Sequence, residues 1–359
     1  MPSGEVTSSN PSTETSLVKK ENKTTSEHIP RISTLRSGTF AGDSLECPSP
    51  YRRPIIILFR CNHSLMRQSK QLPFYKMNGI GNDFVLFDAR TFDKHPPESE
   101  VQLLCDRKRG VGADGVILLE EGDEHPFRMV MYNPDGSRPE MCGNGIRCIA
   151  RLIYDLGASD RTDFKIETDA GVKELQLRVD ETSGDVEGVR VNMGAPGLTR
   201  SQVPMNGPDE PVRDEPIQIE NQAFDITAVS TGNPHITIFV DDAEDVKLEE
   251  WGPQLEYHDA FPERTNVHFV EVLGDHELRQ RTWERGAGVT EACGTGACGV
   301  SVSSIVTDRA ASPITVHLDG GDLNISWSGN EDPIYMEGPA EYCFTGDWSI
   351  RDDSWRQDV

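Results

Sequence analysis

The sequence lacks an apolar run long enough to cross a membrane as a helix, which takes roughly 20 residues. The best candidate, residues 54–59, is far shorter and has Arg52, Arg53 and Arg60 around it. An excess of positive charge is also missing, because 60 Asp and Glu against 35 Lys and Arg give a formal net charge of -25. Such a charge repels nucleic-acid phosphates and anionic membrane surfaces. We therefore expect neither a nucleic acid nor a membrane among the partners.

The cysteines lack the spacings of a disulfide scaffold and of a zinc site. The chain has 8 Cys, most of them in glycine-rich or otherwise regular segments rather than in the dense, loop-rich pattern of small secreted domains. This favours a reducing cytoplasm. The pair Cys142/Cys148 lies outside the Cys-x2-4-Cys spacing typical of zinc ligands, and Cys293/Cys298 reaches only its upper limit with no second such pair beside it. We therefore expect no metal.

Acidic residues are spread through the whole chain instead of forming a tail. Such a surface keeps its hydration when salt screens its charges. We take this as a hypothesis of a salt-loving source, with an ordinary acidic cytosolic protein as the alternative.

The first 72 residues lack sustained apolar periodicity and are rich in Ser, Thr, Glu, Lys and Pro, so we expect a disordered extension there. Its acidic residues argue against an organellar targeting peptide, and a translation start at Met66 is the simpler hypothesis. From residue 73 on, short β-like runs alternate with turn signals, for example in segments 83–87, 115–119 and 127–132.

Two segments break this β pattern and form an internal repeat. MCGNGIRC, which starts at Met141, is echoed by ACGTGAC, which starts at Ala292, about 150 residues further along. Each precedes a helix that is apolar or small on nearly every face, at 145–156 and 296–305. The repeat predicts an α+β fold of two pseudo-symmetric lobes, each a mostly antiparallel sheet or barrel around a central helix, with the site in the cleft between them. We expect the lobes at 73–192 and 193–337, a strand at 338–350 that returns to the first lobe, and a tail at 351–359.

Cys142 and Cys293 stand where each helix begins. Unpaired backbone N–H groups and the helix dipole favour a thiolate there, so we expect lowered pKa values and base chemistry near neutrality. Two equivalent lobes would present one sulfur to each face of a carbon atom, as inversion of a stereocentre requires. A disulfide between the two is expected only as an oxidation product. Four other cysteines are expected to be core residues: Cys105, Cys148, Cys298 and Cys343.

From about Phe74 to Gly346 the chain resembles the diaminopimelate epimerases, segment by segment and in order. The matching segments are KMNGIGNDF (76–84), RGVGADG (109–115), NPDGS (133–137), MCGNG (141–145), VNMG (191–194), GNPH (232–235), Phe261-Pro262 with Asn266, ERGAG (284–288) and ACGTG (292–296). The resemblance implies interconversion of LL- and meso-2,6-diaminoheptanedioate in lysine synthesis, without pyridoxal phosphate or metal. It also implies a homodimer.

The resemblance carries over onto particular positions of this sequence. Cys142 and Cys293 would be the acid/base pair, assisted by His235 and Glu284. The substrate would be held by Asn82, Asn133, Asn144, Asn233, Asn266, Glu284 and Arg285 and by backbone N–H groups of Gly143, Gly294 and Thr295. Away from this series, each Asn would be read as an ordinary turn residue.

Two positions raise questions. Glu284 and Arg285 are adjacent and would point to opposite faces of a regular strand, so both reach one substrate only if the chain bends at Gly286 and Gly288. Gly115 stands where some members of the family carry a substrate-contacting Gln, and it is not assigned.

Three alternatives remain. A proline or hydroxyproline racemase also uses two cysteines, but the asparagines and the Glu284-Arg285-Gly286 segment favour an open-chain diamino diacid. Phenazine-biosynthesis-like isomerases share the fold without this cysteine pair. A redox or thiol-binding module is the alternative from another functional class.

Overall fold

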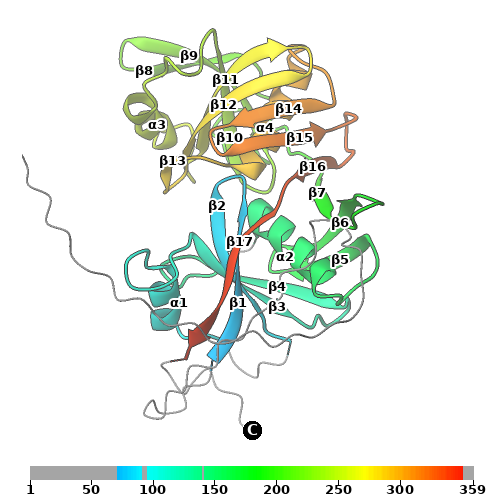
Figure 1. Ribbon diagram of the computed structural model, residues 1–359. Coiled ribbons are helices and arrows are strands. Elements are labelled where there is room, and N and C mark those ends of the chain that lie inside the picture. The colour runs from blue at the N-terminus through cyan, green and yellow to red at the C-terminus, as the bar shows by residue number, and fades with distance from the viewer. Residues whose placement is uncertain (1–70, 91–94, 140, 351–359) are drawn as a thin grey trace, which may run out of the picture. The chain divides into compact units, whose positions relative to one another are not determined.

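The computed structural model describes residues 71–90, 95–139 and 141–350 (Figure 1). All of them belong to one compact unit, which runs from Ser64 to Val359. The predictions made for residues 1–70 and 351–359, including a start at Met66 and a disordered extension, lie outside the described residues.

The first lobe contains two helices and seven strands. They are α1 (Glu98–Cys105), α2 (Gly143–Asp155), β1 (Gln71–Gly79), β2 (Asn82–Asp88), β3 (Gly115–Glu120), β4 (Phe127–Tyr132), β5 (Asp163–Thr168), β6 (Gly171–Val179) and β7 (Val186–Gly194). The first strand begins at Gln71, two residues before the expected start of the lobe.

The second lobe contains two helices and nine strands. They are α3 (Leu248–Glu256), α4 (Gly294–Val306), β8 (Glu215–Ile219), β9 (Gln222–Ser230), β10 (Pro234–Val240), β11 (Asn266–Gly274), β12 (Glu277–Glu284), β13 (Gly288–Thr290), β14 (Ile314–Leu318), β15 (Gly321–Ser326) and β16 (Ile334–Gly338).

The two lobes repeat one pairing pattern. Along β1 to β7, successive pairs are antiparallel, parallel, antiparallel, parallel, antiparallel and antiparallel. The same order describes β9, β10, β11, β12, β14, β15 and β16. The central helix, α2 or α4, enters at the equivalent point of each series. The expectation of two pseudo-symmetric α+β lobes is therefore confirmed.

The central helices are buried because each sheet has protein on both faces. Ile117 and Leu119 of β3 pack with residues of α2 in one apolar cluster, while Val116 and Leu118 pack with α1 in another. Successive strand residues point to opposite faces, so the all-apolar run of β3 follows from helices on either side. The cluster around α2 also contains residues of α4, which joins the cores of the lobes.

Two strand pairings join the lobes. β16 pairs with β7, and β17 (Glu341–Ser349) then runs antiparallel to β1 in the first lobe (Figure 1). β7 extends to Gly194, so the boundary expected between residues 192 and 193 falls inside a strand. The boundary expected between 337 and 338 falls inside β16 in the same way.

Cys105, Cys148 and Cys298 are buried, but the expectation for Cys343 is wrong: it is exposed on β17. None of the helices in the described ranges is long and apolar enough to cross a membrane.

Candidate active site

A cavity of about 1470 Å³ lies between the lobes and is lined from both of them. Cys142 is the residue before α2 and Cys293 the residue before α4, and both line this cavity. Nine other predicted site residues line it as well: Asn82, Asn133, Gly143, Asn144, Asn233, Glu284, Arg285, Gly294 and Thr295. Segments far apart in the sequence thus converge on one hollow.

Cys142 caps α2. Its Sγ accepts a hydrogen bond from the backbone N–H of Gly145 at 3.4 Å, and its thiol lies 3.9 Å from Oδ1 of Asn82, which can accept from it. Burial raises the pKa of the Cys142 thiol, while backbone N–H groups of Gly145 and Asn144 and the charge of Arg147 lower it by less. The expected lowering of the Cys142 pKa is therefore wrong, because loss of water around the sulfur outweighs the effect of the helix start.

Cys293 is influenced by a carboxylate, that of Glu284. Its Sγ lies 3.8 Å from Oγ1 of Thr295. Burial raises the pKa of Cys293 well above its ordinary value, and the nearby Glu284 carboxylate raises it further. Burial also raises the pKa of Glu284, which accepts a hydrogen bond from Thr290 at 2.8 Å. The two thiols are thus unequal: Cys142 has a cation nearby and Cys293 an anion.

The chain bends directly after β12, as the two glycines suggested. Gly286 and Gly288 have φ of 78° and 80°, a region open to glycine at little cost. Glu284 and Arg285 both line the cavity as a result. The backbone N–H of Arg285 donates to Oδ1 of Asn266 at 2.9 Å, which anchors the turn.

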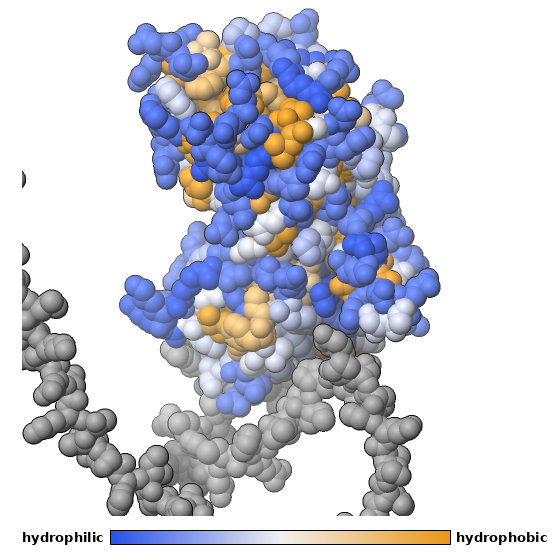
Figure 2. Space-filling view, turned by 45° about the horizontal axis from the view of Figure 1, so that its top comes forward, coloured by the Kyte–Doolittle hydropathy of each residue, from blue (hydrophilic) through white to orange (hydrophobic). Residues whose placement is uncertain are grey.

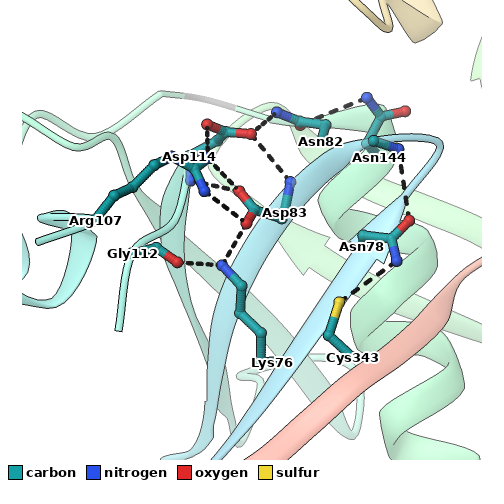
Figure 3. A network of polar contacts seen from close by, with 10 residues as sticks. Lys76, Asn78, Asn82, Asp83, Arg107, Gly112, Asp114, Asn144 and Cys343 are labelled. Carbon is teal, nitrogen blue, oxygen red and sulfur yellow. Dashed lines mark hydrogen bonds and ion pairs between the residues drawn. The ribbon is translucent and has the colours of Figure 1, made fainter. Parts of the chain in front are cut away.

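A charged network supports Asn82 from below (Figure 3). Asn82 donates through Nδ2 to Asp114 at 3.0 Å, and Arg107 bridges Asp114 and Asp83 at 2.8 and 2.7 Å. The buried Lys76 lies 2.6 Å from Asp83. Burial raises the pKa of Asp83, but hydrogen bonds from Arg107 and Lys76 outweigh it and bring the value to about 2.

The structure differs from expectation at His235 and Asn266, which do not line the cavity. β10 turns the His235 side chain toward α4, where a Cβ on Gly299 would lie 3.2 Å from that of His235. His235 therefore lies behind Asn233, to whose Oδ1 its Nε2 is 2.8 Å distant. Asn266 is buried and donates to the carbonyl of Pro234 at 2.8 Å.

A second buried histidine, His268 of β11, lies behind His235 with a separation of 2.9 Å between Nε2 and Nδ1. Burial lowers the pKa of His268 to about 3 and that of His235 well below its ordinary value. Both rings are therefore neutral near pH 7. Sequence reasoning missed His268, because only the parallel pairing of β10 with β11 brings it beside His235.

Other cavity residues were not assigned from the sequence: Arg107, Asp114, Lys173 and Thr290. Asp114 belongs to the RGVGADG segment (109–115) and precedes Gly115. A Cβ on Gly115 would lie 2.8 Å from the carbonyl oxygen of Tyr132 on β4, so a longer side chain there would require a shift between β3 and β4.

A family model described as diaminopimelate epimerase matches residues 74–199 and 227–343. The chain is 48% identical over 279 residues to the diaminopimelate epimerase of Moorella thermoacetica, an alignment that covers 77% of this chain and 99% of that one. It is 42% identical over 279 residues to that of Methanococcus maripaludis, covering 78% of this chain and all of the other.

Solved structures share the fold at much lower identity. A hydroxyproline epimerase from Agrobacterium vitis superposes with a TM-score of 0.58 at 13% identity, covering 81% of this chain and 96% of that one. A phenazine biosynthesis protein of the PhzF family from Bacillus anthracis gives 0.56 at 16% identity, covering 78% of this chain and all of the other. With the family model matching most of both lobes, the resemblance seen in the sequence is confirmed, and the chain belongs to the diaminopimelate epimerase family.

Proposed function

We propose that this isomerase interconverts LL- and meso-2,6-diaminoheptanedioate, with Cys142 and Cys293 as the two acid/base groups. The observation that carries the proposal is their placement: equivalent residues of duplicated lobes, each at the start of a buried helix, line one cavity. One sulfur takes the α-proton as a thiolate, and the other delivers a proton to the opposite face as a thiol. The product has the inverted configuration, and the two sulfurs have exchanged protonation states.

The polar groups of the cavity suit a zwitterionic diacid. Arg285 offers a planar fork to a carboxylate. The Glu284 carboxylate can accept from the ammonium, and the amides of Asn82, Asn133, Asn144 and Asn233 can donate to carboxylate and accept from ammonium. Asn266 supports this set indirectly, because it holds the backbone of Arg285.

The backbone N–H groups of Gly143, Gly294 and Thr295 stand in the first turns of α2 and α4. These groups lack intrahelical partners and favour negative charge. They would stabilise the charge that develops on the substrate carboxylate as the α-proton leaves. No cofactor is part of the proposal.

The cavity exceeds the roughly 300–1,000 Å³ usual for small-ligand sites, which supports closure of the lobes around bound substrate. Closure would exclude water and bring both sulfurs to the α-carbon.

The test is solvent-isotope exchange at the substrate α-carbon, together with epimerisation. Cys142→Ala and Cys293→Ala should each lower the rate of epimerisation by about a thousandfold, within the range attributed to a positioned acid or base. Cys343→Ala is the control, since that thiol is exposed on β17. Wild-type epimerisation in either active-site variant would contradict the proposal.

Two further outcomes would redirect it. Racemisation of proline in place of isotope release from diaminopimelate would favour the proline racemase alternative. A Cys142→Ser variant that lost only a redox titration, with epimerisation intact, would favour a thiol-binding module.

A reducing cytoplasm and a homodimer also belong to this proposal. All six cysteines in the described ranges are free thiols, which supports a reducing compartment. The homodimer is carried over from the family resemblance.

A further inference from the structure

Arg147 of α2 is a fully buried arginine close to Cys142. Its relative exposure is 0%, and it is among the largest side chains with no exposed surface. The guanidinium donates to the carbonyls of Gly143 at 3.0 Å and Pro339 at 3.1 Å, to Oδ1 of Asn144 at 3.0 Å, and to the sulfur of Met336 at 3.8 Å. All four acceptors are neutral.

Glycines keep the space around this guanidinium open. A Cβ on Gly79, where β1 ends, would lie 3.0 Å from Nη2 of Arg147. A Cβ on Gly338, where β16 ends, would lie 3.2 Å from Nε. Both distances are shorter than ordinary contacts between such atoms, so two strand ends are shaped around the cation.

The cation has no carboxylate partner within 4 Å in the described part of the chain. A guanidinium stays protonated in proteins, and burial of a charge without a counter-charge is costly. The ionisable groups that interact with it are the thiols of Cys142, Cys148 and Cys298. Burial raises the pKa of Cys148 and Cys298 to about 12, so those two stay neutral.

We propose that Arg147 is a positioning residue for the epimerisation: its charge favours the thiolate of Cys142, and its fork holds the Asn144 amide in one orientation. Cys142 is the member of the three thiols that lines the cavity and accepts a backbone N–H. Ionisation of Cys142 supplies the counter-charge that the neutral acceptors do not. This inference rests on the proposed function, because it concerns the same sulfur.

The orientation of Asn144 follows from the chemistry of its neighbours. A guanidinium can only donate, so Oδ1 of Asn144 must face Arg147. The Nδ2 group then points away, and it lies 3.5 Å from Oδ1 of Asn82. The same Asn82 oxygen faces the Cys142 thiol at 3.9 Å. Arg147 thereby fixes the Asn144 amide, whose donor faces the oxygen of an Asn82 amide that Asp114 orients.

Other charged groups face Cys142 from the opposite lobe. Glu284, where β12 ends, opposes the thiolate of Cys142, and Arg285 and Cys293 line the same cavity. A change at Arg147 leaves these groups in place, and the alkylation midpoint of Cys293, followed in the same sample, reports any shift that they cause.

The test measures the pH dependence of alkylation by iodoacetamide, with Cys142 and Cys293 resolved by peptide mass spectrometry, in the full chain. In Arg147→Met the midpoint for Cys142 should rise by about one pH unit or more, as expected for loss of a nearby opposite charge, while that for Cys293 moves less. The fraction of thiolate then falls about tenfold per unit. In the direction in which Cys142 takes the proton, kcat/KM near neutrality should fall by the same factor, because kcat/KM reports the free enzyme.

Arg151→Met is the matched control, because Arg151 lies one turn further along α2 and bonds Asp155 and the carbonyl of Ala340. Arg147→Lys keeps the charge but loses the guanidinium fork that holds Asn144. The alkylation midpoint of Cys142 should therefore stay near that of the wild type, while kcat falls. Should Arg147→Met fail to fold, Arg147→Lys decides alone, and wild-type kcat in it would overturn the positioning role.

An unchanged Cys142 midpoint in folded Arg147→Met would overturn the electrostatic role and leave Arg147 as a structural residue. Alkylation does not depend on the substrate. If the wild type failed to act on diaminopimelate, the proposed function would fall while the Arg147 measurement still gave its own answer.

Discussion

His235 and His268 form a buried pair whose protons can be assigned from their partners. Oδ1 of Asn233 can only accept, so Nε2 of His235 carries the proton and Nδ1 accepts from Nε2–H of His268. Nδ1 of His268 then accepts from the hydroxyl of Thr282 at 3.0 Å. Each group of this chain thus donates to the next one toward the cavity, and the last donor, Nε2–H of His235, fixes the orientation of the Asn233 amide.

This pair leads to a prediction for His268→Leu. The change removes the donor to His235, and Asn233 loses its fixed orientation. We expect KM for diaminopimelate to rise about tenfold with a smaller effect on kcat, the size expected for loss of one hydrogen bond to a positioned group. Steady-state kinetics measures both constants.

The control is His317→Gln, which alters a partly exposed histidine held by Asp322 and Glu277, away from the cavity lining. His268→Gln retains an amide donor and should recover part of the affinity. An unchanged KM in folded His268→Leu would show that the buried pair does not act on the cavity.

At the same scale, residue types and spacing located the two cysteines that line the cavity but not the direction of their pKa shifts. A cysteine before a helix is an argument about local hydrogen bonds and the helix dipole. The pKa direction depends on how much water the fold removes from the sulfur. That quantity depends on contacts between the lobes, which no local pattern contains.

Among the elements, α2 and α4 each have a glycine at an equivalent position of the first turn, Gly145 and Gly296, where the helix packs closely on its surroundings. A Cβ on Gly145 would lie 2.7 Å from Cδ1 of Ile117, and one on Gly296 would lie 2.4 Å from Cε1 of His268. The third residue of each helix therefore sets how closely the helix start approaches the sheet.

We predict that Gly296→Ala lowers the free energy of unfolding by about 1–3 kcal/mol, as is typical of overpacking in a core. It should also lower kcat/KM, because the added methyl group lies 3.0 Å from Sγ of Cys293 and would displace that sulfur. Thermal unfolding and kinetics measure the two effects.

Gly274→Ala is the control for this element, since a Cβ there has no atom within 4 Å. The double variant Gly296→Ala/His268→Ala should recover stability relative to Gly296→Ala alone, because it removes the ring that the methyl group meets. Additive losses in the double variant would contradict this packing argument.

For the elements, the sequence predicted β2, β3, β4 and both central helices to within a few residues. Their apolar runs and turn residues are local signals. From the sequence, Glu284 and Arg285 could face one cavity only if the chain bends at Gly286 and Gly288. The positive φ values of these two glycines show that bend.

For the whole molecule, the dominant feature is its net charge of -25. The face shown in Figure 2 is largely hydrophilic, with apolar residues in small separate areas. Like charges repel within the Debye length, about 10 Å at 0.1 M salt and about 3 Å at 1 M.

We therefore predict that the midpoint of thermal unfolding rises from dilute buffer to molar salt. Each increment of salt screens the repulsion between excess carboxylates, which opposes the compact state. Activity should follow the folded fraction over the same range. Full stability in dilute buffer, with no further rise, would count against a salt-loving source and favour an ordinary acidic protein.

By itself the sequence determined the duplication and the fold class, because a repeated Cys-Gly-x-Gly segment before an apolar helix is a local pattern that occurs once in each lobe. Its resemblance to the diaminopimelate epimerases indicated the reaction. Only the tertiary structure decided which groups stand behind the cavity. His235 faces α4, His268 lies behind it, and within the described ranges Arg147 donates only to neutral acceptors. Those facts depend on strand pairing and on burial between segments distant in the chain, and hydrogen-bond direction and desolvation are set by such contacts.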